Sequence, residues 1–118
     1  MGADEQANAV FESVAELFAL LSTPIRLKII GALCNGEKNV SQLLAEIDTT
    51  QPNMSQHLST LYRAGVLGKR RESTQIYYRV QSERVATLCR AVCTQVAIEL
   101  DGQSDMSSGE RLLPTSGR

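Results

Sequence analysis

The chain has 118 residues, a formal net charge of −1 and few aromatic side chains. This length allows one modest domain, and a composition rich in leucine, valine, isoleucine and alanine favours a helical protein over a β-sandwich or barrel. No apolar run comes close to the roughly 20 residues that cross a bilayer, and the first residues carry acidic side chains where a secretory signal carries basic ones. We therefore expect a soluble, cytoplasmic protein.

The first part of the chain predicts two helices. Apolar residues recur at helical spacing from about Asn8 to Leu21. Ser22-Thr23-Pro24 is typical of a helix N-terminus with proline in the first turn. A second helix is expected from there to about Cys34, where Asn35-Gly36 ends it. The apolar positions are Val10, Phe11, Val14, Leu17, Phe18 and Leu21 in the first helix and Leu27, Ile30 and Leu33, expected to be buried, in the second.

The middle of the chain predicts two more helices and a hairpin. A short third helix covers about Val40 to Ile47, and a fourth covers Gln51 to Ala64 and is closed by Gly65. Two strand-like runs, residues 66–71 and 75–80, flank a polar turn and predict a β-hairpin. Two short helices followed by a hairpin form a winged helix-turn-helix. We therefore expect a mainly α fold with a small β-hairpin wing.

A last helix is expected from about Ser82 to Leu100. Residues 1–7 are expected to form a flexible N-terminus, residues 8–100 the winged helix-turn-helix domain, and residues 101–118 a disordered tail rich in glycine and serine. The predicted buried stripe of this helix consists of Val85, Leu88, Val92 and Val96, with Cys89 within it and Cys93 at its edge.

Charge is segregated along the chain. Residues 1–16 contain four acidic and no basic side chains. A locally basic segment in a nearly neutral chain is typical of a face that binds a polyanion, although charge alone fits a solvated surface hairpin equally well. The basic segment contains Arg63, Lys69, Arg70, Arg71, Arg79 and Arg84 against only Glu72 and Glu83.

The fourth predicted helix has an apolar and a polar face. At about 100° per residue, Met54, Leu58 and Leu61 share one face. The other face carries amide, hydroxyl and basic side chains that fit base edges and phosphates, and no carboxylate that would repel DNA. We expect this helix to discriminate between DNA sequences and the hairpin to add affinity. Each phosphate that the hairpin neutralises should add about 0.9 to the slope of log affinity against log salt. The candidate DNA-contacting residues are Gln51, Asn53, Ser55, Gln56, His57, Ser59, Thr60, Arg63, Lys69, Arg70 and Arg71.

His57 is the only histidine. It lies beside the apolar stripe of the fourth helix, and no cysteine, aspartate or second histidine lies at ligand spacing from it. A packing or phosphate-contact role is therefore favoured over a metal site.

Cys34, Cys89 and Cys93 are too few and too unevenly spaced for a secreted disulfide framework. Arg90 is next to Cys89 and Lys38 is near Cys34 in the sequence, and nearby positive charge activates a thiol. The cysteines could form a redox or reactive-sulfur switch, hold a soft metal or metalloid, or be small buried hydrophobes. An enzyme is not expected, because the chain offers no credible base for a cysteine nucleophile and no phosphate-binding loop.

Several motifs resemble the ArsR/SmtB family of bacterial repressors, over roughly residues 14–96. The most specific is the Ser-Gln-His-Leu stretch followed by Ala-Gly-Val-Leu. The resemblance implies a homodimer built on the first and last helices, which binds an inverted-repeat operator and releases it when an inducer binds. The matching segments are Pro24-Ile-Arg-Leu-Lys-Ile-Ile30, Val40-Ser-Gln-Leu43, Gln51-Pro-Asn-Met-Ser-Gln-His-Leu58, Leu61-Tyr-Arg-Ala-Gly-Val-Leu67 and Tyr77-Tyr-Arg-Val80.

The usual metal ligands of that family are missing. The Cys-Val-Cys motif of its arsenic sensors is replaced by Asn39-Val40-Ser41-Gln42, and no histidine follows His57 where the zinc sensors carry Asp/His pairs. No cofactor or resident metal is therefore expected. An alternative is a repressor that responds to a soft metal or metalloid through Cys34, Cys89 and Cys93. An alternative of another class is a winged-helix dimerisation or adaptor module without DNA binding.

One branch of the family, the persulfide and sulfane-sulfur sensors, carries one cysteine on each of the second and last helices. The resemblance implies that reactive sulfur links these cysteines through a di- to tetrasulfide bridge and lowers DNA affinity. Here Cys34 lies about one turn later, and Cys93 about one turn earlier, than in that branch. Whether Cys89 or Cys93 is the partner of Cys34 is therefore open.

Overall fold

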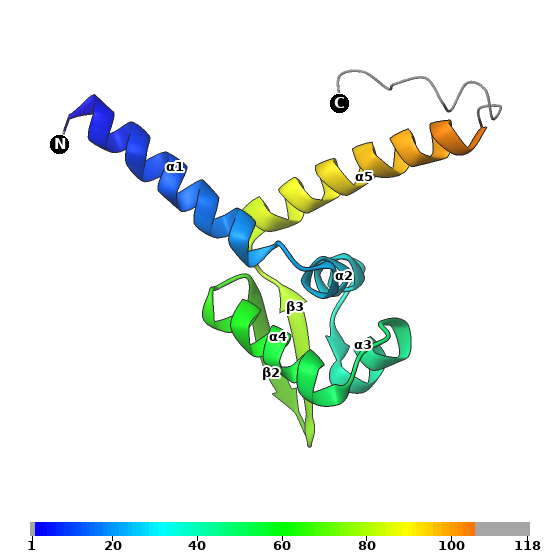
Figure 1. The fold of residues 1–118 in the computed structure, drawn as a ribbon. Coiled ribbons are helices and arrows are strands. Elements are labelled where there is room, and N and C mark those ends of the chain that lie inside the picture. The colour runs from blue at the N-terminus through cyan, green and yellow to red at the C-terminus, as the bar shows by residue number, and fades with distance from the viewer. Residues whose placement is uncertain (1, 106–118) are drawn as a thin grey trace.

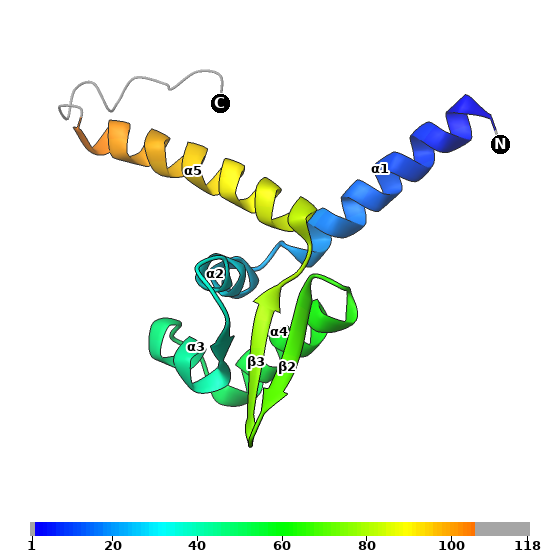
Figure 2. The ribbon, with the colours of Figure 1, turned by 180° about the vertical axis from the view of Figure 1, so that it is seen from behind.

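The computed structural model describes residues 2–105 (Figure 1). They form a mainly helical domain with a small antiparallel sheet, as the sequence predicts. Helices α1 and α5 extend away from the rest of the domain in different directions (Figures 1 and 2). In chain order the elements are α1 (Ala3–Leu20), α2 (Pro24–Leu33), β1 (Lys38–Asn39), α3 (Val40–Glu46), α4 (Gln51–Arg63), β2 (Leu67–Glu72), β3 (Gln75–Val80) and α5 (Glu83–Asp105).

The sheet has three antiparallel strands in the order β1, β3, β2. Strands β2 and β3 form the predicted hairpin, with Arg70 opposite Tyr77, and Ser73 in its turn has a positive φ of 59°. Strand β1 was not predicted, because two residues are too few to show an alternating pattern. It pairs Asn39 with Tyr77 and so fastens the wing to the start of α3.

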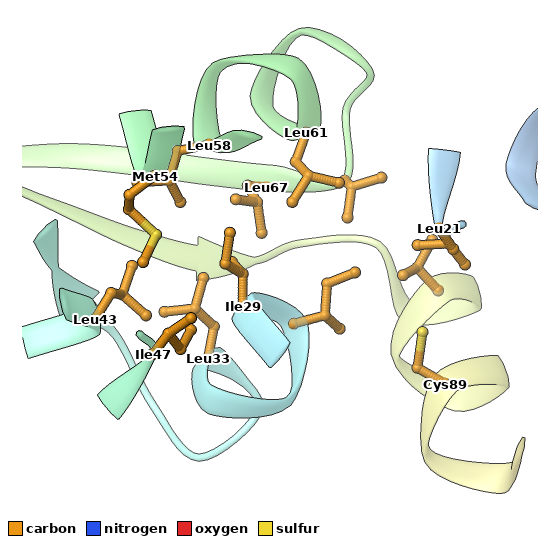
Figure 3. Packing of buried hydrophobic residues seen from close by; sticks show 13 residues of the cluster. Leu21, Ile29, Leu33, Leu43, Ile47, Met54, Leu58, Leu61, Leu67 and Cys89 are labelled. Atoms are coloured by element: carbon orange, nitrogen blue, oxygen red, sulfur yellow. The ribbon is translucent and has the colours of Figure 1, made fainter. Parts of the chain in front are cut away.

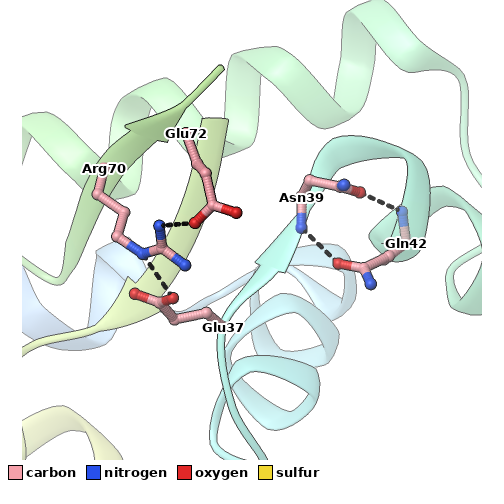
Figure 4. A network of polar contacts seen from close by, with 5 residues as sticks. All are labelled: Glu37, Asn39, Gln42, Arg70 and Glu72. Carbon is pink, nitrogen blue, oxygen red and sulfur yellow. Dashed lines mark hydrogen bonds and ion pairs between the residues drawn. The ribbon is translucent and has the colours of Figure 1, made fainter. Parts of the chain in front are cut away.

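Side-chain caps begin the three helices that follow α1. Thr23 at α2 and Thr50 at α4 each accept a hydrogen bond from the backbone N–H three residues further on. At α3, Asn39 and Gln42 form a reciprocal pair of side-chain to backbone bonds of 2.8 and 2.9 Å (Figure 4). These local signals explain why the predicted starts of α2, α3 and α4 are confirmed.

The hydrophobic core lies where α2, α3 and α4 meet the hairpin (Figure 3). The predicted apolar face of α4, with Met54, Leu58 and Leu61, is confirmed as part of the core, and Leu43 of α3 and the following Ile47 are also buried there. Leu27 was predicted to be buried and is 37% exposed, whereas Ile29 is fully buried. Helix α2 is apolar on more than one side, so periodicity alone could not select its buried face. The fully buried side chains are Ile29, Ile30, Leu43, Met54, Leu58, Leu61, Leu67 and Val85.

Helices α1 and α5 leave most of their apolar side chains exposed. The C-terminal end of α1 joins the core through Leu17 and Leu20, and the following Leu21 is buried near Cys89 of α5 (Figure 3). The predicted buried stripe of α5 is correct at Val85 and Cys89 and partly correct at Leu88, but Val92 and Val96 are exposed, because α5 has left the rest of the domain there (Figure 1). The exposed apolar residues of these helices are Val10, Phe11, Val14, Phe18, Val92, Val96, Ile98 and Leu100.

Both terminal helices are longer than predicted. Helix α1 begins at Ala3 instead of about Asn8, so residues 3–7 are helical where a flexible N-terminus was predicted. Its start is held by Glu5, whose carboxylate accepts a 3.1 Å bond from the Gly2 N–H. Helix α5 continues to Asp105, into the predicted disordered tail; residues 106–118 of that tail lie outside the described residues. In residues 2–105, no helix combines the length and apolar character needed to cross a membrane.

Candidate nucleic-acid interface

Helix α4 presents one face to the core and the opposite face to solvent. Met54, Leu58 and Leu61 are fully buried (Figure 3), and this face packs on α2, α3 and β2. On the other face, Gln51, Ser55 and Gln56 are exposed. Within residues 2–105 these three side chains form no hydrogen bond, so their donors and acceptors are available to a ligand.

The remaining predicted polar residues of α4 bond to one another or to nearby residues. The amide of Asn53 donates to the Thr49 hydroxyl at 2.8 Å. The Thr60 hydroxyl donates to the backbone carbonyl of Gln56 at 3.0 Å. On the next turn Arg63 donates to the Ser59 hydroxyl, also at 3.0 Å. These bonds fix side-chain orientation, and Arg63 keeps its exposed charge.

His57 is half-buried at the edge of the polar face and contacts α2. Its Nδ1 accepts a 3.1 Å hydrogen bond from Nε of Arg26, and Nη1 of Arg26 also donates to the Leu20 carbonyl at the end of α1. Burial, and then the charge of Arg26, hold the pKa of His57 below its ordinary value. Arg26 was not predicted as a site residue, because its partner lies 31 positions away and no local pattern links the two.

The basic run of the wing is divided between the two faces of the sheet. Side chains alternate along a strand, so Lys69 and Arg71 share one face and Arg70 lies on the other. The Lys69 ammonium lies 4.3 Å from the centre of the Tyr62 ring of α4. Arg71 donates through Nε to the Ser73 carbonyl at 3.3 Å. Lys69 and Arg71 are exposed and have no carboxylate partner in the described part of the chain.

Arg70 is held by two carboxylates, as Figure 4 shows. Its Nη1 lies 2.6 Å from Glu72 and its Nε 2.8 Å from Glu37, and these bonds, the one to Glu72 first, raise its pKa. The guanidinium also lies 4.9 Å from the centre of the Tyr77 ring. Arg70 therefore has surroundings different from those of its two neighbours, because strand alternation turns it towards acidic partners.

The three cysteines open onto two different cavities. Cys34 is exposed just after α2 and lines a cavity of about 200 Å³ that Arg90 also lines. Lys38, which the sequence places near Cys34, instead forms a 3.0 Å ion pair with Glu46. Cys89 and Cys93 line an apolar cavity of about 320 Å³ with Phe18, Leu21, Leu27, Leu88 and Val92.

Cys89 is the buried thiol of the three, and Cys93 is exposed. Burial raises the pKa of Cys89, and the neighbouring thiols of Cys93 and Cys34 raise it further. Among residues 2–105, no three cysteine, histidine or acidic side chains are grouped so that they could hold a metal ion.

Comparison with known proteins identifies the family. Residues 23–69 match the family model described as "Bacterial regulatory protein, arsR family". A biofilm growth-associated repressor from Agrobacterium fabrum is 40% identical over 79 residues, which cover 67% of this chain and 68% of that protein. The crystal structure of the transcriptional repressor BigR from Xylella fastidiosa superposes with a TM-score of 0.72 at 33% identity, covering 82% of this chain and 96% of that one.

A solution structure of a homodimeric winged helix-turn-helix DNA-binding domain from Mycobacterium bovis is also similar. Its TM-score is 0.71 at 30% identity, and the match covers 86% of this chain and 93% of that one. The residues that match the family model, 23–69, run from the N-cap of α2 into the first part of β2 and so contain α2, α3 and α4. The chain belongs to the arsR family of bacterial regulatory proteins.

Proposed function

We propose that this protein is a homodimeric transcriptional repressor that binds an inverted-repeat operator and leaves it when its cysteines react with reactive sulfur species. One observation carries the proposal. Helix α4 is anchored by three fully buried side chains, while its opposite face exposes unbonded amides and hydroxyls beside cations without carboxylate partners in residues 2–105. This combination suits a helix that lies in the major groove of DNA. We place this function in the cytoplasm.

The two parts of this surface make different contributions. Glutamine amides read base edges through paired donors and acceptors, so Gln51 and Gln56 supply sequence discrimination. Arg63, Lys69 and Arg71 contact phosphates, and each neutralised phosphate adds about 0.9 to the salt dependence of binding. The ring of Tyr62 holds Lys69 against α4, so the wing and the helix approach DNA as one unit.

The exposed apolar faces of α1 and α5 support a homodimer. Phe11 is 71% exposed, Phe18 56% and Ile98 60%, and such a surface normally marks an interaction site. A second copy covers it through a two-fold interface, in which the same patch serves both partners. The similar domain from Mycobacterium bovis is homodimeric. A two-fold dimer presents two α4 helices about one DNA turn apart, which matches an inverted repeat.

The cysteines supply the switch. The Cys34 thiolate attacks a sulfur of hydrogen disulfide, HSSH, forming Cys34–S–SH and releasing hydrosulfide. The Cys89 thiolate then attacks Sγ of Cys34, which breaks the Sγ–SH bond, releases a second hydrosulfide and leaves a Cys34–Cys89 disulfide. The polysulfide is the oxidant: two thiolates lose two electrons, and HSSH is reduced to two HS⁻.

The order of these steps follows from the surroundings of the thiols. Cys34 is exposed and lines a cavity with Arg90, whereas Cys89 is buried, so a dissolved polysulfide reaches Cys34 before Cys89. Cys89 is buried and its pKa is raised, so it reacts second. The bridge joins the end of α2 to α5, and α2 packs on α4. Oxidation therefore changes the orientation of α5, a helix of the proposed dimer interface, relative to α4, the helix proposed to contact DNA.

Intact mass spectrometry and DNA binding test the proposal together. Reduced protein is exposed separately to polysulfide, hydrogen peroxide and arsenite, and then titrated with a duplex that the reduced protein selects from a random library. We expect polysulfide to produce a Cys34–Cys89 bridge, with or without retained sulfur, and to weaken binding. An unchanged mass and affinity under all three conditions would contradict the switch. Failure of the reduced protein to select any duplex would instead favour an adaptor module.

A further inference from the structure

A single guanidinium group connects α1, α2 and α4. Arg26 on α2 donates through Nη1 to the Leu20 carbonyl at 3.0 Å, and through Nε to His57 Nδ1 on α4 at 3.1 Å. Its backbone N–H is held by the Thr23 hydroxyl at 3.1 Å. The guanidinium has no carboxylate partner in residues 2–105, so its directed bonds end on the carbonyl and the imidazole. Two bonds therefore fix the position of the guanidinium, and the third fixes the backbone of Arg26 at the start of α2.

The bond from Arg26 determines which nitrogen of His57 carries the proton. A guanidinium has only donors and does not deprotonate in proteins, so Nδ1 of His57 must accept and cannot itself bear a hydrogen. In a neutral imidazole the proton then lies on Nε2. The imidazolium form is disfavoured, because both of its nitrogens are donors and its charge would face that of Arg26. Burial and Arg26 both lower the pKa of His57 accordingly.

The Nε2–H of His57 is left without an acceptor in the described part of the chain. His57 is half-buried at the edge of the polar face of α4, directly after exposed Gln56 and before buried Leu58. This donor lies at the edge of α4, on the side towards α2 and away from the centre of the polar face. It is therefore better placed to reach the DNA backbone than to reach a base. A phosphate oxygen, which only accepts, is the matching group.

We propose that Arg26 is a positioning residue that fixes His57 as the Nε2–H tautomer, so that this uncharged imidazole donates a hydrogen bond to a DNA phosphate at the edge of α4. This inference rests on the proposed DNA binding and adds a role for Arg26, which does not itself touch the DNA. The imidazole orients α4 in the groove without releasing a counterion, because it is neutral. It therefore differs from Lys69 and Arg71, which bring a positive charge to the phosphate.

The tautomer can be observed directly in the free protein. His57 is the only histidine, so a long-range ¹H–¹⁵N correlation spectrum of the ¹⁵N-labelled full chain at neutral pH contains one imidazole pattern. We expect the Nε2–H pattern in the wild type and tautomeric averaging in Arg26→Ala. An Nδ1–H or imidazolium pattern in the wild type would overturn the inference whatever the protein binds.

Two substitutions of His57 separate the bond that Nδ1 accepts from Arg26 from the bond that Nε2–H is proposed to donate to a phosphate. His57→Asn keeps an acceptor near the position of Nδ1 but loses the outward donor, whereas the longer amide in His57→Gln restores a donor near Nε2. A hydrogen bond from a neutral donor to an anionic phosphate is worth about tenfold to a hundredfold in affinity, and the dimer contains two such bonds. We expect His57→Asn to lose that affinity for both a selected and a scrambled duplex, and His57→Gln to stay near the wild type.

The salt slope should be the same in wild type and His57→Asn, because no charge is removed. Thermal unfolding of both variants shows whether they fold. Equal affinity of wild type and His57→Asn, or a loss confined to the selected duplex, would overturn the phosphate bond while leaving the proposed function intact. A wild-type protein that binds neither duplex would overturn both the proposed function and the phosphate bond. The spectrum of the free protein would still test whether Arg26 fixes the tautomer of His57.

Discussion

The ammonium group of Lys69 lies 4.3 Å from the centre of the Tyr62 ring, so the first cation of the wing is held against α4. The next residue, Arg70, lies on the opposite face of the strand and is bound to Glu37 and Glu72. Two adjacent basic residues therefore have different surroundings. The Lys69 charge is available to a phosphate, and the Arg70 charge is offset within the wing.

This division predicts different salt dependences for substitutions of adjacent residues. Lys69→Gln and Arg71→Gln should each reduce the slope of log affinity against log salt by about 0.9 for each phosphate that is no longer neutralised. Arg70→Gln is the matched control, from the same strand, and should change the slope little. Binding titrations at several salt concentrations measure the slopes. Equal slope changes for all three variants would mean that the whole basic run binds DNA.

The end of α4 makes a prediction about stability. Gly65 has a positive φ of 83°, and the N–H groups of Gly65 and Val66 donate to Tyr62 and Leu61 to close the helix. Gly65→Ala should destabilise the protein by about 1 kcal/mol, because a side chain disfavours this conformation. Gly31→Ala, in a helical position with no atom near the added methyl group, should stabilise it by about 0.5–1 kcal/mol. Denaturant unfolding that shows the same sign for both would contradict this account of Gly65.

The starts of the helices and the buried side of α4 could be predicted because their signals are local. Thr23 and Thr50 cap helices within three residues of themselves, and Met54, Leu58 and Leu61 repeat at helical spacing. The polar interactions that shape the site join distant residues: Arg26 and His57 are 31 positions apart, and Glu37 and Arg70 are 33 apart. Periodicity does not reveal such pairings, so the sequence indicated the polar face of α4 but not how Arg70 or His57 is held.

The incorrect burial predictions have a related cause. Val92 and Val96 repeat at helical spacing with Val85, yet only Val85 meets the core of this chain. Periodicity shows that a face is apolar and does not show what covers it. Leu27 and Cys89 line one cavity with residues of α1 and α5, whose directions depend on tertiary packing.

The exposed apolar face of α1 predicts which substitution weakens the proposed dimer. If Phe11 is buried at a two-fold interface, each copy contributes about 1.5–3 kcal/mol. Phe11→Glu should therefore weaken the dimer by about a hundredfold or more. Glu12→Gln, an exposed change on the same helix, should have little effect. Light scattering across a dilution series measures the change, and an unaltered dimer in Phe11→Glu would show that α1 is not part of the interface.

Thiol reactivity should follow burial. Iodoacetamide should modify Cys34 and Cys93 before Cys89, because burial and the neighbouring thiols disfavour the Cys89 thiolate. Since the pKa of Cys89 is raised on folding, its neutral thiol stabilises the fold below the unfolded value of about 9.0. That stability is lost as the pH rises through the folded pKa. Peptide mapping after timed alkylation gives the order, and Cys89 reacting first would contradict the proposed sequence of oxidation steps.

The central claim is that the solvent face of α4 reads DNA. The most direct test compares the affinity of reduced wild type, Gln56→Ala and Arg70→Gln for a selected inverted-repeat duplex and a scrambled one at fixed salt. We predict that wild type and Arg70→Gln prefer the selected duplex and that Gln56→Ala loses about 1–3 kcal/mol of that preference for each base it no longer reads. Equal binding of both duplexes by the wild type, or an unchanged preference in Gln56→Ala, would contradict the account.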